Sequence, residues 1–343
     1  MLKEALFYEK LEGNKVKCYL CNHNCVIAPG KTGICKVRIN KEGTLYSLVY
    51  GKPVAEAIDP IEKKPLYHFL PGSLSYSIST IGCNFRCRFC QNHHISQYPV
   101  EKLGVPGEFV PPEEIVKKAL FYQAQSISYT YTEPTIYFEY ALDICKLAKN
   151  AGIKNVFVSN GYMSLQAIEE IAPYLDGINV DLKSFREDFY KKLCSAKLQP
   201  VLESLKALKR FGIWVEVTTL IIPEENDDPN ELKDIASFIK DELGEETPWH
   251  ISRFYPNYQL NLHPPTPLST LEKALEIGKE IGLKFVYIGN VPGHQAEHTY
   301  CPSCNSLLIE RQGFYNIKKI NLTDEGRCAN CNTLIEGVWN LRD

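Results

Sequence analysis

The stretch SYSISTIGCNFRCRFCQNHH, residues 75–94, decides the fold of this chain, because a strand-like run in it leads directly into three cysteines. Cys83, Cys87 and Cys90 have the spacing C-x3-C-x2-C. A loop that follows a strand can wrap a metal cluster, and three thiolates on a four-iron cluster leave one iron open. The spacing therefore predicts a [4Fe–4S] cluster with one open iron.

A structural zinc site is the main alternative for this loop. Zinc in such sites takes four ligands, and the three cysteines supply only three of them. His93 and His94 follow closely, but their position does not clearly provide the fourth ligand. We therefore favour the iron–sulfur cluster.

Short runs of β-branched or aromatic residues alternate with amphipathic stretches along the middle of the chain. The amphipathic stretches carry apolar residues at helical spacing, and several close with a glycine, such as Gly152 or Gly212. Repeated βα units favour a parallel sheet that right-handed crossovers curl into a barrel. We predict an α/β fold, a partial (β/α)6-7 barrel of the TIM-like kind. The predicted strands are 75–81, 126–132, 155–161, 177–183, 214–222, 249–255 and 284–290.

Length, composition and charge restrict the class of protein. The chain has 343 residues, of which 44% are hydrophobic and 23% charged, close to the globular average. No apolar run approaches the roughly 18 residues that a membrane span needs. Residues 1–10 lack the pattern of a secretory signal, so we expect a cytoplasmic protein. The net charge of −3, without a basic block, disfavours a nucleic-acid substrate.

The N-terminal cysteines form a second group. Thirteen cysteines are many for a reducing compartment, where clustered thiols more often bind metal than form disulfides. This group has the spacing C-x2-C-x3-C-x9-C in a segment too short for a core of its own, so a metal should organise it. Zinc and an auxiliary [4Fe–4S] cluster both suit an all-cysteine site, and His23 could replace a thiol. The group consists of Cys18, Cys21, Cys25 and Cys35.

Two C-terminal knuckles form a third group, Cys301-Pro-Ser-Cys304 and Cys328-Ala-Asn-Cys331, separated by 23 residues that include a hairpin-like stretch. This arrangement is typical of a zinc ribbon. Zinc is our first choice there, and an auxiliary cluster or a rubredoxin-like iron is the alternative. We expect the two terminal groups to form separate four-cysteine sites.

The cysteine groups and the strand pattern divide the chain into three parts. We predict an N-terminal cysteine-rich extension with a tether over residues 1–74, in which 36–74 reads as a small β-hairpin followed by a Pro-rich connection. The barrel spans 75–295. A zinc-ribbon-like knuckle spans 296–343.

Polar residues close three of the predicted strands after the cysteine loop. In βα barrels the chemistry lies at the C-terminal ends of the strands, so these residues are candidates for a site. Each short motif alone is a weak signal, because a strand-terminal acid is often only a helix cap. In chain order the motifs are Thr132-Glu133-Pro134, Ser159-Asn160-Gly161 and Asp181-Leu182-Lys183.

The cysteine loop, including the aromatic Phe89 before its third cysteine, resembles the signature of the radical S-adenosylmethionine (SAM) superfamily. Over nearly the whole chain, the sequence resembles the radical enzymes of the AmmeMemoRadiSam system, a family similar to pyruvate formate-lyase activating enzyme. This resemblance is carried by DPIEKKPLYHF (59–69), FCQNHHIS (89–96), VTTLIIPEEND (217–227) and RFYPNY (253–258).

The resemblance implies a cofactor site. The open iron would bind the amino and carboxylate groups of SAM, and one electron would then yield methionine and a 5′-deoxyadenosyl radical. Glu133, with Pro134, lies where the family accepts the ammonium group of SAM, and the segment Ser159-Asn160-Gly161 lies where it contacts the ribose. Asp181 and Lys183 match an activase motif in which the lysine neighbours the cofactor carboxylate.

The resemblance also implies partners. The characterised relatives activate glycyl-radical enzymes, so a protein substrate is expected, together with a reductant such as ferredoxin or flavodoxin. The Memo- and AMMECR-like proteins of the system are candidate substrates. Radical chemistry on a small metabolite or on RNA remains an alternative, and so does a metal-binding or electron-transfer protein without substrate chemistry.

Four isolated residues complete the candidates. Cys194 should lie among the loops at the C-terminal face of the barrel, where its thiol could hold a substrate, donate hydrogen or pack against a helix. Cys145 lies within a helical pattern and is expected to be structural. His250 and His263 have no partner visible in the sequence, so we expect packing or surface roles.

Overall fold

The computed structural model describes residues 2–341. Its centre is an eight-stranded sheet in which strands consecutive in the sequence are neighbours. The first strand of this sheet is antiparallel to the second, and every other pair is parallel. The strands are β7 (Ala55–Pro60), β8 (Leu74–Ser79), β9 (Ser126–Tyr129), β10 (Lys154–Ser159), β11 (Gly177–Asp181), β12 (Trp214–Ile221), β13 (Trp249–Arg253) and β14 (Val286–Gly289).

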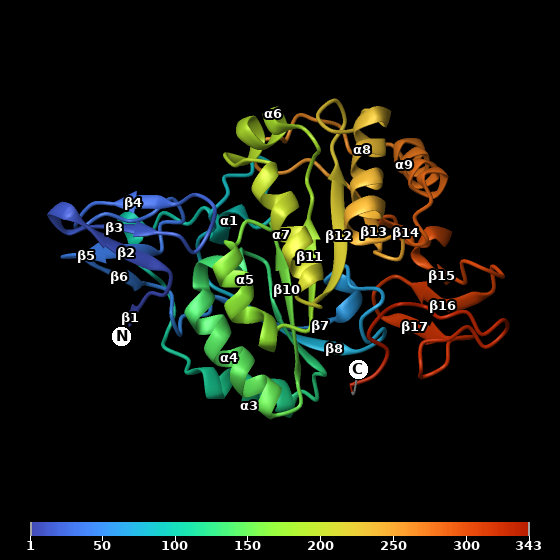
Figure 1. Ribbon diagram of the computed structural model, residues 1–343, viewed down its shortest axis with the longest axis horizontal. Coiled ribbons are helices and arrows are strands. Elements are labelled where there is room, and N and C mark those ends of the chain that lie inside the picture. The colour runs from blue at the N-terminus through green and yellow to red at the C-terminus, as the bar shows by residue number, and fades with distance from the viewer. Residues whose placement is uncertain (1, 342–343) are drawn as a thin grey trace.

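Helices between the parallel strands cover the outer side of this sheet (Figure 1). The α-helices are α1 (His93–Ser96), α2 (Val100–Leu103), α3 (Pro112–Phe121), α4 (Phe138–Asn150), α5 (Leu165–Ile171), α6 (Glu187–Phe189), α7 (Gln199–Arg210), α8 (Pro229–Phe238) and α9 (Leu268–Ile281). Shorter helical turns are η1 (Glu12–Asn14), η2 (Ile61–Lys63), η3 (Pro134–Tyr137), η4 (Ala172–Tyr174), η5 (Tyr190–Cys194), η6 (Ile239–Leu243) and η7 (Gln295–Glu297).

The predicted partial barrel is confirmed. All seven predicted strands form, each within a few residues of its expected bounds. Among the described residues, the sheet leaves its end strands β7 and β14 unpaired with each other, so the barrel is open. The strand β7 was not predicted, because its sequence AEAIDP is short and ends in a proline, and the surrounding segment reads as a loop.

The parallel strands form because both of their faces are buried. Every residue of β9 is buried, and β12 is buried at six of its eight positions. Such strands read as nearly continuous β-branched and aromatic runs, which is the pattern that predicted them. The helices start at clear signals. At α8 the Asp228 side chain accepts hydrogen bonds from the backbone N–H groups of Asn230 and Glu231, and Pro229 occupies the first turn.

The N-terminal extension consists of two small antiparallel sheets at one side of the barrel (Figure 1). One buried ion pair fixes it there. The guanidinium of Arg38 contacts the carboxylate of Glu139 on α4 at 2.9 Å, and this carboxylate also accepts a bond from the backbone N–H of Leu6. The strands are β1 (Lys3–Glu4), β2 (Tyr8–Leu11), β3 (Lys15–Cys18), β4 (Cys25–Ile27), β5 (Arg38–Lys41) and β6 (Thr44–Ser47). The hairpin predicted within 36–74 is formed by β5 and β6.

The C-terminal extension is a three-stranded antiparallel sheet at the opposite side of the barrel (Figure 1). Its strands are β15 (Thr299–Tyr300), β16 (Leu307–Gln312) and β17 (Asn316–Lys319), and β16 and β17 form the expected hairpin. Arg311 reaches from β16 into the body of the protein, where it donates to the carbonyl oxygen of Tyr67 at 2.8 Å and lies 3.9 Å from the carboxylate of Glu62. All three of these residues are buried.

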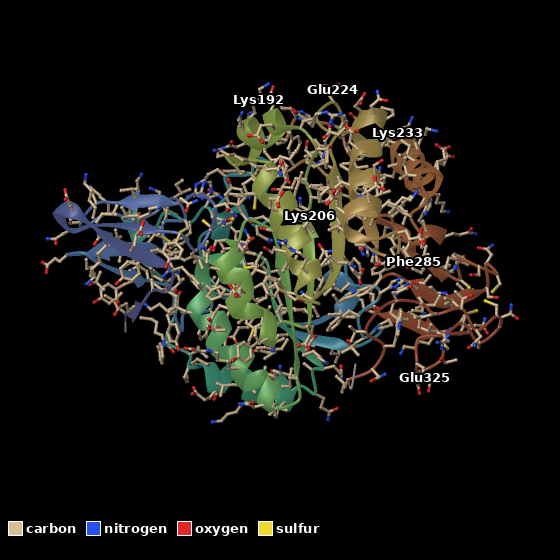
Figure 2. The ribbon with its side chains drawn as sticks, viewed as in Figure 1. Lys192, Lys206, Glu224, Lys233, Phe285 and Glu325 are labelled. Carbon is tan, nitrogen blue, oxygen red and sulfur yellow. The ribbon has the colours of Figure 1, made fainter. Side chains whose placement is uncertain are left out.

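Polar side chains cover the outer surface, as the outward-pointing Lys192, Lys233 and Glu325 in Figure 2 illustrate, whereas the labelled Phe285 packs against the His68 ring, with 4.3 Å between ring centroids. No helix within residues 2–341 is both long and apolar enough to cross a bilayer.

Candidate active site at the mouth of the barrel

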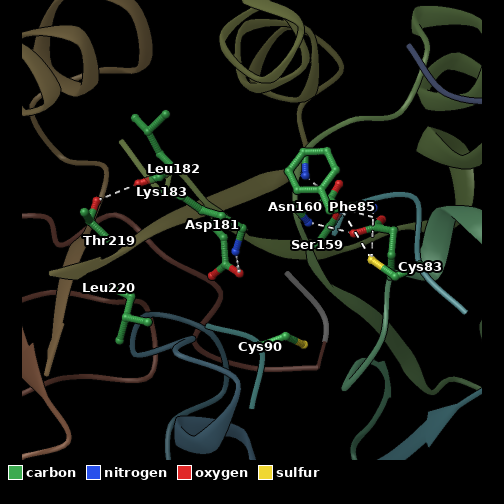
Figure 3. A network of polar contacts seen from close by, with 12 residues as sticks. Cys83, Phe85, Cys90, Ser159, Asn160, Asp181, Leu182, Lys183, Thr219 and Leu220 are labelled. Atoms are coloured by element: carbon green, nitrogen blue, oxygen red, sulfur yellow. Dashed lines mark hydrogen bonds and ion pairs between the residues drawn. The ribbon is translucent and has the colours of Figure 1, made fainter. Parts of the chain in front are cut away.

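A cavity of about 570 Å³ opens at the C-terminal ends of the parallel strands. This is the end of the barrel at which the sequence places its candidate residues. Nine of these candidates line the cavity, and Figure 3 shows several of them, with Cys83, Ser159 and Asn160 close together and Asp181 paired with Lys183 on the neighbouring strand. The nine are Cys83, Cys87, Cys90, Thr132, Glu133, Ser159, Asn160, Asp181 and Lys183.

Backbone hydrogen bonds to the turn η5 hold the cysteine loop after β8 in place. The backbone N–H groups of Arg86 and Arg88 donate to the carbonyl oxygens of Cys194 and Leu193, which belong to η5, at 2.8 and 2.9 Å. The Arg86 guanidinium donates to the carbonyl oxygen of Cys83 at 2.7 Å. These bonds orient the loop so that its three thiols face the cavity.

The three thiols suit a polynuclear cluster better than zinc. Within residues 2–341, they do not belong to any set of three or more Cys, His, Asp or Glu ligand atoms that lie within 4.8 Å of one another. A single zinc ion needs such close ligands. The His93 ring lies parallel to that of Tyr258, with 4.5 Å between centroids, so it packs in the structure.

Glu133 is buried at the end of β9 and organises the neighbouring strand. Its carboxylate accepts hydrogen bonds from the backbone N–H of Asn160 at 2.7 Å and from the Ser159 hydroxyl at 2.8 Å. It also accepts from the backbone N–H of Thr135 and so caps η3, whose first residue is Pro134. Burial raises the pKa of Glu133, and the hydrogen bonds oppose this rise. The carboxylate thus joins two of the predicted strand-end motifs.

The motif Ser159-Asn160-Gly161 forms a tight turn after β10. Gly161 has a φ of +70°, and a Cβ atom there would lie 2.7 Å from a methyl group of Val180, so only glycine fits. The Asn160 amide donates to the Asn84 side chain at 2.7 Å, which ties this turn to the cysteine loop. In the described chain, Gly161 and Pro134 shape the cavity without lining it.

Lys183 provides a positive charge at the end of β11. Its ammonium lies 2.7 Å from the Asp181 carboxylate and 5.7 Å from the centre of the Phe89 ring. Burial disfavours the charged form of this lysine, but the negative charge of Asp181 raises its pKa above the ordinary value. The ammonium therefore stays charged at neutral pH, beside the cysteines.

Cys194 lies under the cysteine loop and does not line the cavity formed by the described residues. Its side chain is 0% exposed, and its thiol is hydrogen-bonded to that of Cys87. This bond and burial raise the pKa of Cys87. The position favours the packing role that the sequence left open for Cys194. Cys145 is likewise fully buried, as expected.

One wall of the cavity was not predicted from the sequence. Lys64 and Tyr131 both contact the buried carboxylate of Asp59, which Lys64 reaches at 2.6 Å. Although burial opposes it, the hydrogen bonds from Lys63, Lys64 and Tyr131 lower the pKa of Asp59. The only signal in the sequence was the density of charged residues within DPIEKKP, 59–65.

His250 has a buried partner that the sequence analysis did not reveal. It lines the cavity from β13, and its Nε2 atom lies 2.6 Å from the fully buried carboxylate of Glu216 on β12. The backbone N–H groups of Tyr67 and His68 donate to the same carboxylate at 2.9 and 2.8 Å. The partner of His250 comes from 34 residues earlier, so no local pattern reveals it. His263 lies near the surface, 3.3 Å from Glu225, as expected.

The four C-terminal cysteines form a compact group. Their sulfur atoms all lie within 4.8 Å of one another, with 3.5 Å between Cys301 and Cys331 and 3.7 Å between Cys304 and Cys328. Four sulfurs around a zinc ion, each at about 2.3 Å from it, lie about 3.8 Å apart. Hydrogen bonds with Asn330 and Ser306 lower the pKa of Cys304, which favours the thiolate that a metal binds.

We expect Cys304→Ala to remove this metal. Elemental analysis should find about one zinc per chain in the natural protein and almost none in the variant, because a zinc site that loses a thiolate becomes labile. The variant should also melt about 5–10 °C lower, since metal binding stabilises the folded sheet. Cys145→Ala is the matched control and should keep its zinc. Iron in place of zinc in the natural protein would contradict the assignment.

Comparison with known proteins agrees with this geometry. Residues 77–239 match the model of the radical SAM superfamily. An uncharacterized protein of Methanocaldococcus jannaschii is 50% identical over 338 residues, which cover 98% of this chain and all of the relative. A pyruvate formate-lyase-activating enzyme of Clostridium pasteurianum is 27% identical over 53% of this chain and 77% of its own length. A putative glycyl-radical enzyme activating enzyme of M. jannaschii is 30% identical over 64% of this chain and 81% of its own length.

The residues of the cavity fit the cofactors that such a site requires. Three thiols that do not crowd together suit a [4Fe–4S] cluster with an open iron. The charged and polar groups of SAM can pair with three side chains of the cavity. Glu133 supplies a buried carboxylate as acceptor, Asn160 a polar amide, and Lys183 an ammonium group.

Lys183→Ala is expected to weaken SAM binding about tenfold, since one charge-assisted hydrogen bond contributes about 1.5 kcal/mol. Calorimetry on the reconstituted protein measures the affinity, and iron analysis should show an intact cluster. Lys63→Ala is the control, because Lys63 also lines the cavity but is half exposed and paired with Asp59. Equal affinities in the two variants would contradict a role for Lys183.

Proposed function

Because the chain belongs to the radical SAM superfamily, we propose that it cleaves SAM reductively at a [4Fe–4S] cluster held by Cys83, Cys87 and Cys90. When bound, the cluster and SAM supply methionine and a radical that abstracts hydrogen. The observation that carries this proposal is the cavity itself, in which the three thiols face the polar ends of the strands β9, β10 and β11.

The residues of the chain have distinct parts in this proposal. Lys183 holds a positive charge beside the cysteines, suited to the carboxylate of SAM. Glu133 presents a buried carboxylate toward the ammonium group and at the same time fixes the turn that carries Asn160.

We propose a protein as the substrate. The support is that two relatives carry the name of activating enzymes, one for pyruvate formate-lyase and one for glycyl-radical enzymes in general. The expected partners are the Memo- and AMMECR-like proteins, together with ferredoxin or flavodoxin as reductant in the cytoplasm. The net charge of −3, without a basic block in the sequence, argues against RNA.

An anaerobic assay tests the proposal. Reconstituted protein, reduced with dithionite and supplied with SAM, should release 5′-deoxyadenosine, and protein without reductant should not. Addition of each candidate partner should produce a new organic radical signal in electron paramagnetic resonance (EPR). A protein that carries its full cluster and makes no 5′-deoxyadenosine would exclude the reaction, and product without any signal would exclude the partner tested.

A further inference from the structure

The four N-terminal cysteines surround a cavity of their own. Cys18 and Cys35 are 7% and 8% exposed, and the other two thiols are partly buried. The remaining wall comes from residues of the extension and of the barrel, most of them buried. It consists of Leu20, His23, Ile27, Gly33, Ile34, Arg38, Asn84, Thr135 and Ile136.

The backbone brings these cysteines together from separate elements. Cys18 on β3 and Cys25 on β4 are directly opposite each other in an antiparallel pair. Cys21 lies in the loop between these strands, and its backbone forms an isolated antiparallel β-bridge with Met163 of the barrel. Cys35 lies just before β5. Four thiols that converge on one cavity from four places in the extension indicate a common ligand.

The sulfurs of the N-terminal group are not arranged as closely as those of a zinc site. Of all Cys, His, Asp and Glu side chains in residues 2–341, only the C-terminal four form a group of three or more with ligand atoms within 4.8 Å of one another. No three of the N-terminal sulfurs therefore lie mutually within 4.8 Å, whereas the sulfurs of a zinc site lie about 3.8 Å apart. A four-iron cube holds its thiolates farther apart, because two irons and their bonds lie between any two of them.

Two hydrogen-bond donors on this wall have no partner among the described residues. They are Nε of Arg38 and Nδ2 of Asn84, on side chains that are 2% and 1% exposed. The other nitrogens of Arg38 bind Glu139 and Leu6, and the Asn84 oxygen accepts from Asn160. A buried donor without a partner costs about 1–3 kcal/mol. The sulfides of an iron–sulfur cluster are acceptors that such donors can serve.

We propose that this cavity holds an auxiliary [4Fe–4S] cluster, bound by Cys18, Cys21, Cys25 and Cys35, with Arg38 and Asn84 as hydrogen-bond donors to it. All four irons then have a protein thiolate. The cluster has no open iron, so it transfers electrons and does not bind SAM.

The auxiliary cluster would lie behind the loop of the first one. The Nε2 atom of His23 lies 2.8 Å from the carbonyl oxygen of Asn84, next to Cys83. A Cβ atom at Gly82 would lie 3.0 Å from the carbonyl oxygen of Cys35, and the Arg86 guanidinium binds the carbonyl oxygen of Ile34. The two cysteine segments are therefore in direct contact, with Asn84 on the wall between them.

This placement suits a one-electron relay, a role that rests on the proposed function. A low-potential donor such as reduced flavodoxin would give one electron to the auxiliary cluster. That cluster would return to its oxidised state as it passes the electron to the cluster of the active site. The thiolates of both clusters stay bound throughout, and no bond of the protein breaks.

Metal analysis of the triple variant Cys83→Ala, Cys87→Ala, Cys90→Ala tests the assignment without the activity. After anaerobic reconstitution it should keep about four irons and four sulfides per chain, and Mössbauer spectroscopy should show a four-iron cluster. Adding Cys21→Ala and Cys25→Ala should remove them, whereas adding Cys145→Ala should not. A triple variant with almost no iron, or with zinc at this site, would overturn the proposal even if every further variant failed to fold.

Two measurements test the relay. The fully reduced natural protein should show an EPR spectrum broadened by coupling between its two clusters. In Cys25→Ala, the ratio of flavodoxin-driven to dithionite-driven 5′-deoxyadenosine formation should fall at least tenfold. An unchanged ratio would overturn the relay. The iron analysis of the triple variant would then still decide whether the auxiliary cluster exists. If the natural protein makes no 5′-deoxyadenosine, the proposed function fails, and the iron count still decides the auxiliary cluster.

Discussion

Cys87→Ala is expected to abolish 5′-deoxyadenosine formation, with a loss of at least about a thousandfold, and to remove about four irons per chain. A cluster held by three thiolates that loses one has two open irons and becomes labile. The same result is expected for Cys83 and Cys90, because the loop places all three on one cavity wall. Anaerobic turnover and iron analysis measure the two effects.

Cys145→Ala is the matched control for this prediction. Its thiol is as buried as that of Cys194 but lies on α4, away from the cavity. The variant should keep both iron and turnover. Natural iron content and turnover in Cys87→Ala would show that another group binds the cluster.

Glu133→Ala is expected to weaken SAM binding roughly ten- to a hundredfold, which corresponds to about 1.5–3 kcal/mol for a lost charge-assisted bond. The substitution also leaves the backbone N–H groups of Thr135 and Asn160 without their acceptor inside the protein. We therefore expect a lower melting temperature as well. Calorimetric titration with SAM and thermal denaturation measure the two effects separately.

Glu187→Gln is the control for Glu133. Its carboxylate also accepts a backbone N–H, from Leu198 at 2.8 Å, but it does not line the cavity in the described part of the chain. It should lose some stability and keep its affinity for SAM. If Glu133→Ala binds SAM as the natural protein does, Glu133 has only the structural role of fixing the turn after β10.

The parts of the site that were predicted from sequence are those encoded locally. The spacing of Cys83, Cys87 and Cys90 is a local pattern, and Glu133, Asn160 and Lys183 each follow a strand that reads clearly. Parallel strands align these ends at one edge, so local motifs become neighbours.

The remaining parts depend on contacts between distant segments. His250 pairs with Glu216, and the tether contributes Lys64 to the cavity through its contact with Asp59. No periodicity records such pairings. The choice between zinc and a cluster at the N-terminal cysteines likewise depends on distances between sulfurs, which residue spacing alone does not determine.

The long-range hydrogen bonds of Tyr67 have a consequence for the order in which the protein folds. Tyr67 is held by Glu216, 149 residues later in the sequence, and by Arg311, 244 residues later. Closing loops of this length is slow, and these bonds require the C-terminal sheet to be in place. During synthesis, the cysteine loop therefore leaves the ribosome well before Tyr67 can form its bonds with Glu216 and Arg311. The mouth of the barrel is therefore less enclosed in the nascent chain than in the complete fold, until the last sheet docks.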